Sequence, residues 1–94
     1  MTDINARATQ AVRGVLAAHG TLHADPWRIG TGDDLYAAGL TSMGSVHVLL
    51  ALEDALGIEF PDRVLDRALF SSIESLTRAA AACLHAGHPL PVSA

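Results

Sequence analysis

The sequence has very little cysteine. Its single cysteine, Cys83, has no second cysteine to pair with, so an intramolecular disulfide is excluded. This usage is typical of a reducing compartment, and we expect a cytoplasmic protein. The first residues lack the basic segment and following apolar segment of a signal peptide. The longest apolar run, residues 48–52, is too short to cross a bilayer, so we expect no membrane partner.

Aromatic residues and positive charge are also scarce. Only 4% of the residues are aromatic, whereas 50% are hydrophobic, and many of these are alanine. This composition favours closely packed helices over a β-sandwich, which would use more β-branched and aromatic side chains. Ten acidic residues against six basic ones give a formal net charge of −4, without a cluster of basic residues. Nucleic-acid binding is therefore disfavoured, because it relies on basic patches that face the phosphates.

Hydrophobic periodicity predicts four helices. Apolar residues recur with helical spacing over residues 3–19 and 42–56. The second of these is apolar over so much of its circumference that we expect it at the centre of a bundle. A short helix is predicted over residues 62–69. The last helix begins with Ser71 as cap, followed by a glutamate three residues later, and extends to residue 85.

The remaining segments are predicted to be irregular. Residues 20–41 hold one proline and several glycines and show no sustained period, so we expect a long first loop. Residues 86–94 contain two prolines and no period, and we expect a disordered tail. The predicted fold is all-α: one domain over residues 1–85, built as a four-helix bundle of three longer helices and one short helix.

A set of sequence landmarks lies between the first loop and the short helix. They are Leu35, Gly39, Ser42 and Met43, followed about one helix later by Leu52, Glu53, Phe60 and Pro61. With these residues the chain resembles the acyl carrier and peptidyl carrier protein family over roughly residues 12–84. Members of that family show Leu or Phe, then Gly, two variable residues, Ser, and Leu or Met. A Leu-Glu segment and an Ile-Pro or Phe-Pro pair follow in the family, as they do here.

The resemblance implies a role for Ser42. A phosphopantetheinyl transferase would attach 4′-phosphopantetheine from coenzyme A to this serine, and the arm would hold an acyl or aminoacyl group as a thioester. The position suits a phosphodiester, because a helix N-terminus offers unpaired backbone amides and a positive dipole end. The alternative is that Ser42 is an ordinary N-cap, worth about 1 kcal/mol. The chain would then be a small helical interaction module without a prosthetic group.

The chain departs from the common carrier pattern near this serine. Many carriers have Asp directly before the serine, where this chain has Thr41. The helix that follows holds no acidic residue before Glu53, so partner contacts near the arm should depend on apolar packing more than on charge. The residues that we expect to contact partners are Leu40, Thr41, Met43, His47 and Val48.

The resemblance also implies partners. Residues 39–42, Gly-Leu-Thr-Ser, and the low charge of the following helix are similar to stand-alone carriers that receive an amino acid from a truncated class II synthetase homologue. The implied partners are the transferase, a ligase that loads an acyl group or an amino acid, and a downstream acyl-accepting enzyme. We expect the carrier to be a monomer. The sequence leaves the cargo open.

No catalytic or metal centre is predicted. Two of the five histidines, His85 and His88, lie three residues apart, but no cysteine or carboxylate completes a set with zinc-ligand spacing. No grouping of nucleophile, base and orienting residue is visible, so we expect a protein without catalytic activity of its own. Cys83 lies on the apolar side of the last predicted helix, where a small buried hydrophobe is the expected role.

Overall fold

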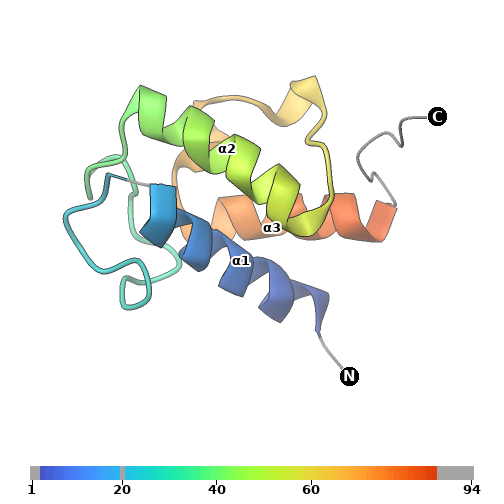
Figure 1. The fold of residues 1–94 in the computed structure, drawn as a ribbon, viewed down its shortest axis with the longest axis horizontal. Helices are drawn as coiled ribbons and strands as arrows, with labels where there is room; N and C mark the ends of the chain where they lie inside the picture. Colours follow the sequence, from blue (N-terminus) through green and yellow to red (C-terminus); the bar gives the residue numbers. More distant parts are fainter. Residues whose placement is uncertain (1–2, 20, 87–94) are drawn as a thin grey trace.

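The computed structural model describes residues 3–19 and 21–86, and these residues form an all-helical bundle without a β-sheet (Figure 1). The three α-helices are α1 (Ile4–His19), α2 (Ser42–Leu56) and α3 (Ile73–Ala86). In the described part of the chain, no helix is both long enough and apolar enough to cross a membrane. The predicted tail lies outside the described residues, except for Ala86, which is the last residue of α3.

The segment between α2 and α3 differs from its prediction. In place of one short α-helix over residues 62–69, the structure has two 3₁₀ turns, η1 (Asp62–Val64) and η2 (Arg67–Phe70). Asp66 separates them with extended backbone (φ −137°, ψ 177°), and its carboxylate accepts a hydrogen bond from the Leu69 amide at 3.0 Å. Because this side chain caps a new turn, the helix cannot continue through it. The described residues thus contain three α-helices, and not the four predicted.

The central helix of the bundle is α1 and not α2. α1 packs against both α2 and α3, whereas α2 and α3 make few direct contacts with each other. Ile58, Phe60 and Leu69, from the segment between those two helices, are buried in the same hydrophobic core. The prediction that the helix over residues 42–56 lies at the centre is therefore wrong. Its buried residues form a single stripe on one face: Gly44, Val48, Leu52 and Leu56.

The first loop, residues 21–41, forms turns without a regular helix and lies at the end of the bundle where α2 begins (Figure 1). Hydrogen bonds fix it to two helices. On the α1 side, the Arg13 guanidinium donates to the carbonyls of Pro26 and Ile29, both at 2.8 Å. On the α3 side, the Glu74 amide donates to the Thr31 carbonyl at 2.9 Å. These contacts hold the loop from which α2 begins.

Candidate functional site

Ser42 is the first residue of α2, and its side chain is exposed to solvent. Among the described residues, no hydrogen bond involves its hydroxyl, although its carbonyl accepts one from the Ser45 hydroxyl at 2.7 Å. The start of α2 carries no acidic residue in its first turn. The Ser42 hydroxyl is therefore presented to solvent at the positive end of a helix dipole.

The neighbouring residue, Thr41, supplies the helix cap. Its backbone is extended (φ −94°, ψ 166°), and its hydroxyl accepts a hydrogen bond from the Gly44 amide at 2.9 Å. The interpretation of Ser42 as an ordinary N-cap is therefore wrong. The cap satisfies one of the four unpaired amides of the first turn, and the amides of Ser42 and Met43 find no partner among the described residues. Unpaired amides beside an exposed hydroxyl fit a phosphodiester at this place.

Gly39 explains the shape of the loop in front of Ser42. Its φ of +116° lies in a region that residues with a side chain rarely adopt. A Cβ atom there would lie 2.8 Å from the Thr21 carbonyl oxygen and 2.9 Å from the His23 ring. Both the backbone angle and the close packing require a residue without a side chain. This requirement explains why a glycine lies three residues before Ser42.

The structure separates the predicted partner-contact residues into two groups. Thr41, Met43 and His47 are exposed beside or beyond Ser42 on α2. Leu40 and Val48 belong to the hydrophobic core, with 5% and 0% of their surface exposed. Because Val48 lies one helical turn from both Gly44 and Leu52, it shares their buried face. Buried side chains do not reach a partner, so Leu40 and Val48 do not belong to a contact surface.

Two exposed apolar residues of α2 were missing from the predicted contacts. Met43 is 66% exposed, Val46 49% and Leu50 58%. Their spacing of three and four residues places them on one face of the helix, and this face begins next to Ser42. We refer to these three residues as the apolar stripe. The sequence carried the signal, because α2 has more apolar residues than one buried face can hold.

A groove of about 340 Å³ adjoins Ser42 between α2, η2 and the first loop. The Tyr36 hydroxyl donates to the Arg67 carbonyl at 3.0 Å, and the Arg67 guanidinium lies 3.9 Å from the centre of the Tyr36 ring. These contacts join the loop to η2 at one border of the groove. The groove is lined by Tyr36, Ser42, Ser45, Val46, Leu49, Leu65, Asp66, Arg67 and Phe70.

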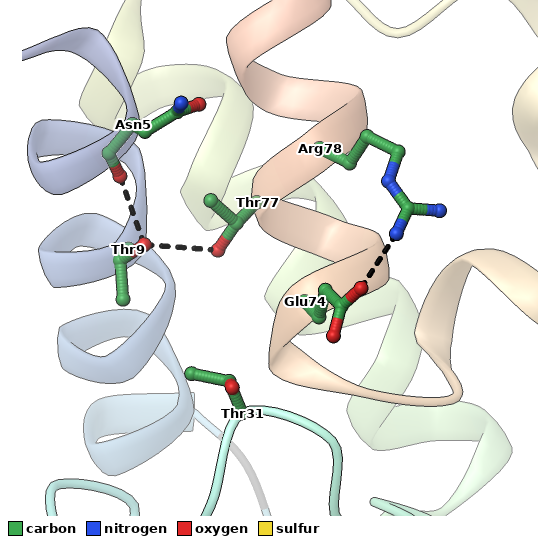
Figure 2. A pocket seen from close by; sticks show the side chains of 6 residues that line it. All are labelled: Asn5, Thr9, Thr31, Glu74, Thr77 and Arg78. Atoms are coloured by element: carbon green, nitrogen blue, oxygen red, sulfur yellow. Dashed lines mark hydrogen bonds and ion pairs between the residues drawn. The ribbon is translucent and has the colours of Figure 1, made fainter.

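A second surface cavity, of about 410 Å³, lies away from this site between α1 and α3 (Figure 2). Its six lining residues come from α1, the first loop and α3: Asn5, Thr9, Thr31, Glu74, Thr77 and Arg78. The ion pair between Arg78 and Glu74, 2.6 Å long, is exposed and spans one helical turn. Exposed pairs of this kind contribute little to stability. None of these side chains comes from α2, so this cavity is separate from the groove beside Ser42.

The part of the chain that the structure describes contains no cluster of potential metal ligands, and its cysteine is buried. No group of three or more His, Cys, Asp or Glu with metal-binding geometry occurs among the described residues, and His88 lies outside them. Burial raises the pKa of the Cys83 thiol, while Arg63 opposes this shift and Glu53 adds to it. Cys83 is 4% exposed, and its thiol remains protonated at neutral pH, which makes it a poor nucleophile.

Comparison with known proteins shows which family the chain resembles. Residues 11–80 match the family described as "Phosphopantetheine attachment site". The chain is 45% identical over 65 residues to the aminoacyl carrier protein of Agrobacterium fabrum strain C58, which covers 69% of this chain and 78% of that protein.

Solved structures show the same fold. In the complex of an engineered Bradyrhizobium japonicum glycine:carrier protein ligase with ATP, the carrier protein from Agrobacterium tumefaciens is 40% identical to this chain, with a TM-score of 0.73. That match covers 77% of this chain and 94% of the other. In the complex of the Bradyrhizobium japonicum ligase with glycylated carrier protein, the match is 30% identical with a TM-score of 0.61. It covers 82% of this chain and 99% of the other.

The helical bundle and the match to the family of phosphopantetheine attachment sites thus define a protein of the carrier class. Because the family match covers more than half of the chain, the chain belongs to the phosphopantetheine-attachment family. It is a carrier and not an enzyme, and it holds an acyl or aminoacyl group as a thioester on a covalently attached 4′-phosphopantetheine.

Proposed function

We propose that Ser42 is the residue that carries the 4′-phosphopantetheine arm. The observation that supports this most is that the Ser42 hydroxyl is exposed and free of the helix cap. The hydroxyl of Thr41 caps α2 in its place. In the attachment step, the Ser42 oxygen bonds to the phosphorus that bears the pantetheine. The pyrophosphate bond of coenzyme A breaks, 3′,5′-ADP leaves, and the serine proton passes to a base of the transferase. The ligase then joins the carboxylate of the cargo to the AMP part of ATP and releases pyrophosphate. The thiol of the bound arm attacks the carbonyl of this acyl adenylate, the bond between that carbonyl carbon and the phosphate oxygen breaks, AMP leaves, and the thiol proton passes to solvent or to a base of the ligase.

The cargo that we propose is an amino acid, loaded by a separate ligase. Two observations support this: the 45% identity to an aminoacyl carrier protein, and the fold match to carriers in complex with a glycine:carrier protein ligase. On this chain, the ligase would dock on the apolar stripe together with Thr41 and His47. The acidic residues of α2, Glu53 and Asp54, lie at the opposite end of the helix from Ser42. The helix itself therefore carries no acidic residue next to the arm, and the charged residues that line the adjoining groove are Asp66 and Arg67.

The rest of the proposal concerns the chain as a whole. We propose that it acts as a cytoplasmic monomer, with its folded carrier domain ending near residue 85. A phosphopantetheinyl transferase attaches the arm, and a downstream acyl-accepting enzyme removes the amino acid.

Loading tests the proposed cargo. The chain would be converted to its modified form with coenzyme A, magnesium and a transferase. It would then be incubated with ATP, glycine and the Bradyrhizobium japonicum glycine:carrier protein ligase. We expect a mass gain of one glycyl group, which hydroxylamine removes. Parallel reactions would offer other amino acids with the ligase, and fatty acids with an acyl-carrier ligase. Loading of long acyl groups alone would contradict an aminoacyl carrier.

A further inference from the structure

The segment that follows α1 lies directly against the backbone that leads into Ser42. The His23 amide donates to the Ala38 carbonyl at 2.8 Å, and the Thr21 carbonyl oxygen packs where a side chain at Gly39 would have to lie. Residues 21–23 and residues 38–41 therefore run in contact across the first loop. These two segments bring the end of α1 next to the start of α2, although the bonded residues are 18 and 20 positions apart in the chain.

The Thr21 hydroxyl is the centre of this contact. It donates a hydrogen bond to the Gly39 carbonyl and accepts one from the Thr41 amide at 3.2 Å. The Thr21 hydroxyl thus donates one hydrogen bond and accepts another, and its two partners are the backbone groups on either side of Leu40. The Thr21 methyl group lies 3.5 Å from the position that a Cβ would occupy on Gly44, so it also packs against the first turn of α2.

We propose that Thr21 is a positioning residue for the attachment of phosphopantetheine, and this inference rests on the proposed role of Ser42. Thr21 holds the two peptide groups on either side of Leu40, and with them the backbone of Thr41, the cap from which the helix begins. The Ser42 hydroxyl has no hydrogen bond of its own among the described residues, so only its backbone fixes its place. A backbone held in one arrangement presents the Ser42 oxygen to the transferase in one geometry. Small displacements of a reacting atom reduce rates by factors of up to about a hundred.

Three variants test this assignment. Thr21→Val keeps the size of the side chain and removes both hydrogen bonds, whereas Thr21→Ser keeps the hydroxyl and removes the methyl group. Thr9→Val is the matched control. Its hydroxyl donates to the Asn5 carbonyl at 2.8 Å and contacts the Thr77 hydroxyl at 3.4 Å, on the α1–α3 side of the molecule (Figure 2).

The first readout is the kinetics of modification by a phosphopantetheinyl transferase with coenzyme A. For Thr21→Val we expect kcat to fall about tenfold or more with KM little changed, because the geometry of the reacting oxygen is disturbed and the docking surface is not. Thr21→Ser and Thr9→Val should keep kcat within about twofold of the native chain. A native kcat for Thr21→Val, or an equal loss in Thr21→Ser, would overturn the proposal.

The second readout does not depend on the transferase. Hydrogen exchange of the backbone amides of Thr41 and Gly44 should become faster in Thr21→Val and stay unchanged in Thr9→Val. Unchanged exchange in Thr21→Val would overturn the positioning role. If the native chain accepts no phosphopantetheine at all, the proposed function fails, and the exchange measurement still decides whether Thr21 orders the start of α2.

Discussion

At the scale of single residues, the two adjacent hydroxyls of Thr41 and Ser42 have separate roles. The Thr41 hydroxyl caps α2, whereas the Ser42 hydroxyl points to solvent. We therefore expect Thr41→Ala to lower the free energy of unfolding by about 1 kcal/mol, and Thr41→Ser to restore most of it. Ser42→Ala should change it by less than about 0.5 kcal/mol. Urea unfolding followed by circular dichroism measures both, and an equal cost for the two alanine variants would contradict the assignment of the cap.

Gly39 gives a second prediction at this scale. Alanine at this position would need a positive φ and would place its Cβ 2.8 Å from a backbone oxygen. We expect Gly39→Ala to lower the free energy of unfolding by about 1–3 kcal/mol, the usual cost of such strain. Gly32→Ala is the matched control, because nothing lies within 4 Å of its added Cβ and its φ is not positive. Similar unfolding curves for the two variants would show that the loop has another shape.

Sequence reasoning reached part of this residue-scale detail. The spacing of Gly39 and Ser42, together with their resemblance to carriers, indicated the site. It could not assign the cap between Thr41 and Ser42, because both residue types are good caps and the choice depends on which of them has extended backbone. The contact between Thr21 and the Thr41 amide was also beyond reach, since no local pattern joins residues 20 positions apart.

At the scale of elements, α2 has two apolar faces with different uses. Leu52 is fully buried, whereas Leu50, two residues earlier, is 58% exposed. Leu52→Ala should lower the free energy of unfolding by about 2–5 kcal/mol, as removal of a buried leucine side chain does. Leu50→Ala should change it by less than about 0.5 kcal/mol, yet weaken loading by the ligase through a higher KM. Urea unfolding and ligase kinetics on both variants check this prediction, and native loading by Leu50→Ala would argue against the apolar stripe as a docking surface.

Hydrophobic periodicity predicted the elements well where they are long. The helix predicted over residues 42–56 has the same bounds as α2, and the one over residues 3–19 starts one residue before α1. The pattern did not distinguish an α-helix from two 3₁₀ turns over residues 62–70, because Asp66 interrupts the helix through its own side chain. It also placed α2 at the centre, since periodicity alone does not show whether an apolar face meets the core or remains exposed.

At the scale of the whole molecule, the formal net charge is −4, and α2 contributes no acidic residue near Ser42. The acids of α2 lie at its far end, and Glu53 accepts a hydrogen bond from the Phe60 amide at 2.8 Å. If docking depends on the apolar stripe, loading should depend weakly on salt. Between about 50 and 500 mM NaCl we expect the ligase KM to change by less than about twofold, because salt screens charge contacts and leaves apolar ones in place. A tenfold rise in KM would indicate docking through charge.

The central claim is that Ser42 carries the arm, and the intact mass of the protein tests it most directly. The native chain, Ser42→Ala and Ser45→Ala would each be incubated with coenzyme A, magnesium and a phosphopantetheinyl transferase. Ser45 is the matched control, because it is the next serine on α2 and its hydroxyl donates to the Ser42 carbonyl. We predict that the native chain and Ser45→Ala gain the mass of one phosphopantetheine and that Ser42→Ala gains none. Modification of Ser42→Ala would contradict the account.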